Sequence, residues 1–100
     1  MRVRFAPRAR SDLTHILAYI DERSPRGARN VKQALKKAIA LIGRHPLIGR
    51  PSKIEETRVF PIGRYPYLIY WSIEAGEVWI VHIRHASRRP WEDELSNRSD

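Results

Sequence analysis

The sequence predicts an α+β domain of order β-α-α-β-β-β, in which an antiparallel sheet carries an N-terminal helical hairpin packed on one face. Apolar residues recur at helical spacing in two stretches between residues 8 and 42. From residue 57 onward they alternate with polar residues, as in strands. One hundred residues with 42% hydrophobic side chains are enough for one modest core. The order of these segments favours two helices packed against one antiparallel sheet.

The first half of the chain predicts one short strand and two helices. Residues 2–6 alternate polar and apolar side chains and end at a proline, which stops a strand. A first helix follows and ends near the segment DERSP. Ser24 can cap a second helix that starts at Pro25, and Gly43 is placed to end that helix. The short connection predicts that the two helices pair as an antiparallel hairpin.

The second half predicts three strands after a loop that contains two prolines and a glycine, at residues 44–53. Residues 57–62 are a strand candidate. Residues 67–73 and 77–85 are strong strands, joined by a tight turn at Ala75-Gly76. A two-residue turn predicts the facing pairs Ile73 and Val78, Trp71 and Ile80, Ile69 and His82, and Tyr67 and Arg84.

The charge balance favours an anionic partner. The chain has 19 Lys and Arg against 11 Asp and Glu, a net charge of +8. The electrostatic field of this positive charge attracts nucleic acid, an acidic protein surface or anionic lipid. The alternative is a basic surface that is solvated by water and binds no partner. The absence of cysteine excludes disulfides and thiolate metal sites. No apolar run is long enough to span a bilayer, so we expect a cytoplasmic protein without membrane association.

A single domain is expected over residues 1–91, and the polar segment 92–100 is expected to be a flexible C-terminal tail. Four segments within this domain, taken together, resemble a known protein family. They are PRARSDLTHILAYI, HPLIGRP, TRVFPIGRYPYLIYW and VWIVHIRHASRRPW. In this order they resemble the ParE branch of the RelE/ParE toxins of type II toxin–antitoxin modules. The resemblance implies the same β-α-α-β-β-β fold.

The resemblance also implies a partner and a target. The partner is a cognate antitoxin protein, which binds and silences the toxin in a hetero-oligomer. ParE-like toxins are associated with inhibition of DNA gyrase and have no recognised catalytic residues. The resemblance therefore implies a gyrase inhibitor that acts by binding rather than as an enzyme. A toxin fold that retains only antitoxin binding stays open as an alternative.

A second alternative is a metal-independent endoribonuclease of RelE type, which cuts messenger RNA on the ribosome. Such cleavage needs a base, a cation for the phosphate and an acid for the leaving oxygen. The candidates for these roles are Arg58, Arg64, Arg84, His85 and Arg88. The resemblance aligns Arg88 with a catalytic arginine of the RelE branch. However, Leu68 stands where that branch carries an arginine, and Trp91 is the aromatic nearest to its C-terminal tyrosine. These departures favour the binding inhibitor.

Two binding surfaces are predicted. Two helices over one sheet cannot bury all their apolar residues, so some should contact the antitoxin; the candidates are Leu13, Leu17, Ile20, Val31, Leu35 and Ile42. Arginines that follow glycines in GRP and GRY, together with the basic C-terminal segment, suggest a rim that suits phosphates or acidic side chains. The candidates for target binding are Arg50, Arg64, Arg84, Arg88, Arg89 and Trp91.

The histidines favour structural roles over chemistry. His85 could act as a general acid, but it continues an apolar strand face, where one structural hydrogen bond is the commoner role. His82 is predicted on the opposite face, so these two histidines cannot share a metal. His15 and His45 lack ligand spacing to any other residue. We therefore predict neither a metal site nor a cofactor.

Overall fold

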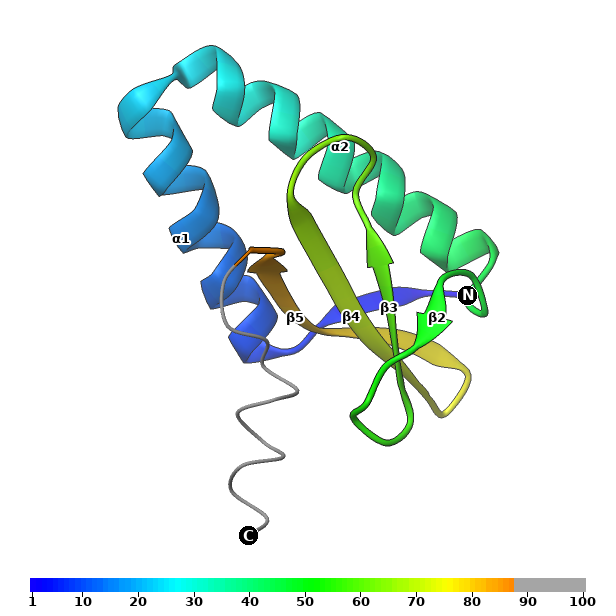
Figure 1. Cartoon of the computed structure of the whole chain (residues 1–100). Helices are drawn as coiled ribbons and strands as arrows, with labels where there is room; N and C mark the ends of the chain where they lie inside the picture. The colour runs from blue at the N-terminus through cyan, green and yellow to red at the C-terminus, as the bar shows by residue number, and fades with distance from the viewer. Residues whose placement is uncertain (88–100) are drawn as a thin grey trace, which may run out of the picture.

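The computed structural model describes residues 1–87 and confirms the α+β class and the order of the predicted elements. The elements are β1 (Val3–Phe5), α1 (Pro7–Arg23), α2 (Pro25–Arg44), β2 (Arg50–Pro51), β3 (Thr57–Pro61), β4 (Tyr67–Glu74) and β5 (Glu77–His85). The short strand β2 lies where only a loop was predicted. The helices diverge from a short connection (Figure 1) and pack on one face of the sheet. The predicted domain boundary at residue 91 and the predicted tail at 92–100 lie outside the described residues.

The five strands form one mixed sheet in the order β1-β5-β4-β3-β2. The prediction of a wholly antiparallel sheet is wrong at one edge, because β1 pairs with β5 in parallel. All the other pairings are antiparallel. The helical hairpin explains the parallel pair. It returns the chain to the end of the sheet where β1 begins, so that β3 and β5 run in the same direction as β1.

The start of α2 agrees with the prediction and its end does not. The Ser24 hydroxyl accepts a hydrogen bond of 2.9 Å from the N–H three residues later. Gly43, predicted to end the helix, lies inside it, and the helix continues to Arg44. A Cβ on Gly43 would lie 3.1 Å from the Val3 side chain and 3.3 Å from the Met1 carbonyl oxygen. The glycine therefore permits the close packing of β1 on the helix rather than ending the helix.

The turn between β4 and β5 confirms the predicted hairpin. Ala75 and Gly76 have φ angles of 50° and 74°, as a two-residue turn with left-handed central residues requires. The pairs nearest the turn, Ile73 with Val78 and Trp71 with Ile80, are those predicted.

Beyond Trp71 the predicted register is wrong because of a β-bulge. The bulge adds one residue, Val81, to β5, so every later pair shifts by one position. Ile69 therefore faces Ile83 instead of His82, and Tyr67 faces His85 instead of Arg84. His82 now lies opposite Tyr70, on the face away from the helices, and His85 lies on the helical face.

Candidate functional site

An apolar groove lies between the two helices and the edge strand β1. β1 runs across the wide end of the V that α1 and α2 form (Figure 1). It is tied at both ends, because the Met1 amine donates to the Gly43 carbonyl oxygen at 2.7 Å and Pro7 begins α1. The groove has a volume of about 600 Å³ and is lined by Met1, Val3, Phe5, Leu13, Leu17, Lys32, Leu35, Lys36, Ile39, Ala40, Gly43 and Arg44. An apolar concavity of this kind is typical of a protein docking site.

The structure brings half of the predicted antitoxin contacts to this groove. Leu13, Leu17 and Leu35 line it. The other three are elsewhere: Ile20 packs beside the core, while Val31 and Ile42 are buried within it, 4% and 0% exposed. Val3 and Phe5 also line the groove but are not among the predicted contacts, since nothing local in the sequence shows that the first strand crosses the open end of the hairpin.

The Arg58 side chain, a candidate for RNA cleavage, holds the loop before β2. Its Nε donates to the Ile48 carbonyl oxygen at 3.1 Å, and one Nη donates to those of Leu47 at 2.7 Å and Gly49 at 3.2 Å. The Trp71 indole N–H, on the neighbouring strand, donates to the carbonyl oxygen just before this segment at 3.0 Å. Arg58 therefore has a structural role, which the alternation pattern of its strand does not reveal.

The side chains of Arg84 and His85 also form hydrogen bonds within the protein. The Arg84 Nε donates to the Tyr70 hydroxyl at 3.0 Å, and one Nη donates to the His85 carbonyl oxygen at 3.1 Å. The His85 Nδ1 accepts the Ser87 backbone N–H at 3.2 Å and lies 2.7 Å from the Ser87 hydroxyl. The His85 and Tyr67 rings pack in a T-shaped arrangement, with their centroids 5.3 Å apart and their planes at 81°.

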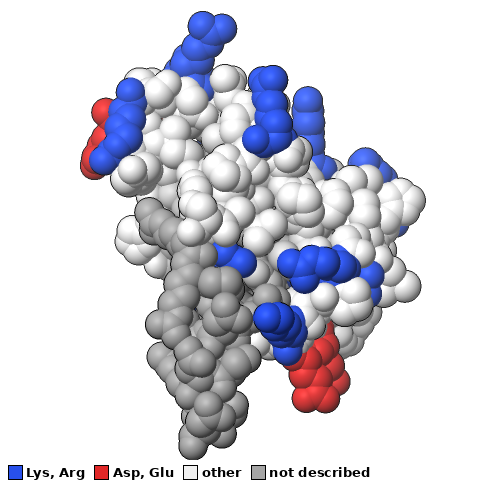
Figure 2. Space-filling model, viewed as in Figure 1, with Lys and Arg blue, Asp and Glu red and all other residues white. Residues whose placement is uncertain are grey.

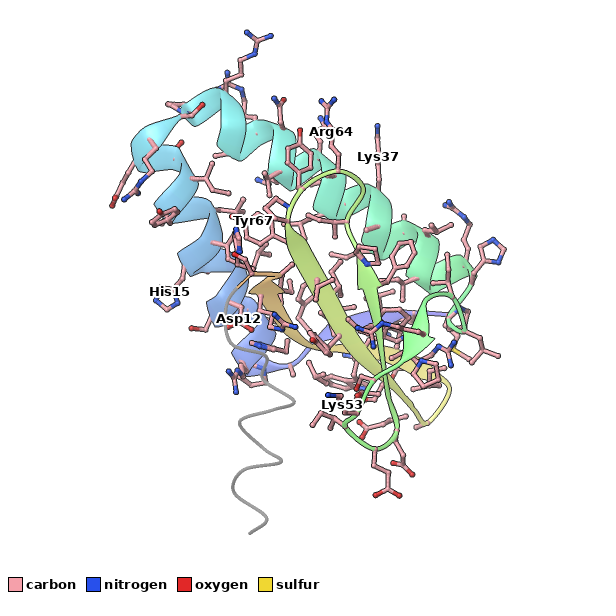
Figure 3. The ribbon with its side chains drawn as sticks, in the orientation of Figure 1. Asp12, His15, Lys37, Lys53, Arg64 and Tyr67 are labelled. Carbon is pink, nitrogen blue, oxygen red and sulfur yellow. The ribbon has the colours of Figure 1, made fainter. Side chains whose placement is uncertain are left out.

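Of the remaining residues of the predicted target surface, the two that the structure describes lie on separate elements. Arg50 is exposed on the edge strand β2. Arg64 is exposed in the loop between β3 and β4, where its guanidinium lies 5.7 Å from the Tyr65 ring (Figure 3). Arg88, Arg89 and Trp91 lie outside the described residues, and so does the part that Arg88 was predicted to play in RNA cleavage.

A carboxylate–imidazole pair that the sequence did not predict lies at the bulged end of β5. Asp12 of α1, labelled in Figure 3, places its Oδ2 2.6 Å from the His82 Nδ1 and accepts the Ile83 backbone N–H at 3.1 Å. A carboxylate only accepts, so the Nδ1 carries the proton. Seventy residues separate Asp12 from His82, and no local motif connects them.

The pKa of His82 is lowered from its usual value near 6.5. Burial is the largest cause, since it removes water from the charged ring. The charges of Arg8 and Arg84 lower the pKa further, and the hydrogen bond and charge of Asp12 oppose these effects. The ring is therefore held in its neutral form near pH 7, as a structural group in the sheet.

The part of the chain that the structure describes contains no group of three or more potential metal-ligating side chains. Within the same residues, neither helix is both long enough and apolar enough to cross a membrane.

Comparison with known proteins identifies the family. The model of the ParE toxin of the type II toxin–antitoxin system parDE matches residues 3–90. The chain belongs to the ParE toxin family. Toxin RelE2 of Caulobacter vibrioides is 39% identical to this ParE-family toxin over 83 residues, which cover 81% of this chain and 90% of that protein. Y4kP of Sinorhizobium fredii is 32% identical over 88 residues, which cover 88% and 91%.

Two solved structures share the fold of this ParE-family toxin. A chain of the chromosomal ParDE system from P. aeruginosa has a TM-score of 0.77 at 20% identity, covering 87% of this chain and 97% of that one. The isolated E. coli RelE toxin has a TM-score of 0.63 at 16% identity, covering 99% and 98%. The protein is therefore a toxin of a type II toxin–antitoxin system with the RelE/ParE fold, and its family implies an antitoxin partner.

Proposed function

We propose that this ParE-family toxin inhibits DNA gyrase by binding, and that its antitoxin silences it by docking in the apolar groove. The observation that supports binding over catalysis is that three of the five candidate catalytic side chains are engaged in hydrogen bonds within the fold. Arg58 binds three carbonyl oxygens, Arg84 binds a tyrosine hydroxyl, and His85 accepts a backbone N–H. A general acid or base must instead reach the proton that it transfers in the substrate.

The groove supports the second half of the proposal. Its lining comes from both helices and from β1, so one partner segment placed there would contact three elements at once. Leu13, Leu17 and Ile39 are only partly buried in the free toxin, which leaves apolar surface for a partner to cover. An antitoxin bound there also stabilises the folded toxin, because it binds the folded and not the unfolded form.

The target is tested by inducing the toxin without antitoxin and measuring plasmid supercoiling and message integrity in the same cells. We expect altered supercoiling with intact messages. His85→Gln, which keeps a hydrogen-bonding group but cannot titrate, is expected to retain most of the toxicity. Cleaved messages with normal supercoiling, together with an inactive but folded His85→Gln variant, would contradict the gyrase proposal and favour the ribonuclease. If His85 were a general acid or base, His85→Gln would lower the rate of message cleavage by about 10²–10⁴-fold.

A further inference from the structure

The groove that is proposed to receive the antitoxin has a charged wall on one side only. The charged side chains that line it, Lys32, Lys36 and Arg44, all belong to α2. The opposite wall, formed by α1, contributes Leu13 and Leu17. The groove is therefore cationic along α2 and apolar along α1.

The cations of this wall are available to a partner. Lys32, Lys36 and Arg44 are exposed, and within residues 1–87 none of them forms an ion pair. α2 itself carries six Lys and Arg and no Asp or Glu. The toxin thus offers these cations no acidic neighbour on their own helix.

The dimensions of the wall define the segment that fits it. Lys32 and Lys36 are one helical turn apart, and Arg44 is twelve residues beyond Lys32, a distance of about 18 Å along an α-helix. An amphipathic helix that lays its apolar face into such a groove reaches the same length with about three turns. Its flank facing α2 would lie beside the three cations.

We propose that the groove selects an amphipathic helix of about three turns that carries acidic side chains on one flank, with that flank against α2. This inference rests on the proposed function of the groove as the antitoxin site. Beside an apolar groove, a bound helix displaces water from the lysines, so an acidic flank restores their partners. A helix without acids leaves Lys32 and Lys36 unpaired, which makes the wall a determinant of partner choice.

The test compares two double variants of α2 with the same change in charge. Lys32→Glu with Lys36→Glu alters the wall, and Arg29→Glu with Lys37→Glu alters exposed positions of the same helix outside the groove. Affinity and rates are measured with the antitoxin of the same module at one ionic strength. We expect the wall pair to weaken binding by about 30-fold or more, mainly through faster dissociation, and the outer pair to slow association by only a fewfold.

Equal losses from the two pairs would overturn the inference, since net charge alone would then explain both. Far-UV circular dichroism and the melting temperature of each variant check that it is folded. Lys32→Gln with Lys36→Gln removes the two positive charges of the wall without reversing them, and it is expected to weaken binding in the same direction. On the antitoxin side, single acid-to-lysine substitutions are scanned against the Lys36→Glu toxin. Restored binding by at least one of them is expected, and restoration by none would contradict the pairing.

A third variant separates this inference from the function on which it rests. Leu13→Gln with Leu17→Gln removes the apolar α1 wall. Unchanged binding by that folded variant would show that the antitoxin does not use the groove. If the leucine variant loses binding while Lys32→Glu with Lys36→Glu binds normally, the antitoxin uses the groove but the proposed acidic flank is rejected. A gain of strand rather than helix signal when the antitoxin binds would also reject the proposed occupant.

Discussion

The Asp12 carboxylate closes a part of the sheet edge that β1 leaves open. β1 pairs with β5 only opposite Val78–Ile80, so among the described strands β5 has no neighbour on that side beyond this point. There the Oδ2 of Asp12 accepts both the Ile83 N–H and the His82 ring N–H. A buried donor left without an acceptor costs about 1–3 kcal/mol. The carboxylate therefore stabilises the bulged end of the strand.

Protonation of His82 is expected to make stability depend on pH. The unfolded chain takes up this proton near pH 6.5, and the folded protein, in which the pKa is lower, takes it up only at more acidic pH. The neutral ring therefore contributes fully to the free energy of unfolding above pH 6.5, and this contribution is lost as the pH falls below that value. The expected loss is at most about 1.4 kcal/mol per pH unit. Urea unfolding at several pH values between about pH 8 and pH 5 measures it.

Two variants control this pH measurement. His82→Asn keeps an amide donor for Asp12 but cannot titrate, so its stability should fall less steeply in acid. His15→Gln alters an exposed histidine and should behave as the unmodified protein does. A His82→Asn variant with the unmodified pH slope would show that His82 does not carry the effect.

At the scale of elements, long-range contacts place the loop that leads into β2. Arg58 of β3 and Trp71 of β4 donate to carbonyl oxygens of this loop. Gly49 has a φ of 76°, and a Cβ there would lie 2.4 Å from the Val59 carbonyl oxygen. Only glycine permits so close an approach at such an angle. The strand β2 therefore forms because two neighbouring strands hold the chain beside β3.

Arg58→Lys is expected to loosen this loop while keeping the charge. An ammonium group cannot reproduce the planar fork that donates to three carbonyl oxygens. We expect a loss of about 1–2 kcal/mol in the free energy of unfolding and faster amide exchange around residues 47–51. Arg50→Lys, on the exposed neighbouring strand, is the matched control and should change neither. Equal exchange rates in the two variants would contradict the role of Arg58.

At the scale of the whole molecule, charge is distributed unevenly. The net charge is +8, and α2 contributes six of the cations without a single acid. In Figure 2, basic side chains stand along the upper edge of the visible face, where α2 lies, and also in its middle and lower part, whereas acidic side chains form one group at the upper left and one at the bottom. Such a field attracts an anionic partner from a distance and mainly raises the rate of association.

Association with the antitoxin is therefore expected to depend strongly on salt. Raising the ionic strength from about 0.05 M to about 0.5 M screens the field and should slow association about tenfold or more, while dissociation changes less. Stopped-flow measurement of both rates over this range checks the expectation. An association rate that does not change with salt would exclude electrostatic steering.

The sequence by itself determined the helices, the long strands and the hairpin turn. Each of these rests on local information: helical spacing in α1 and α2, alternation in β4 and β5, and a glycine at the turn. It also determined the family, because the four segments that carry the resemblance lie along nearly the whole chain. Of the residues that line the apolar groove, it identified Leu13, Leu17 and Leu35 through their apolar spacing on the helices.

Only the tertiary structure decided the parallel direction of β1, the bulge in β5 and the roles of several polar side chains. β1 meets β5 across more than seventy residues, and Asp12 meets His82 across a similar separation. Such contacts leave no periodic signal, because neither partner constrains its own neighbours in the chain. The one-residue shift at Val81 likewise depends on packing against other elements, and it reverses which faces His82 and His85 occupy in the sheet.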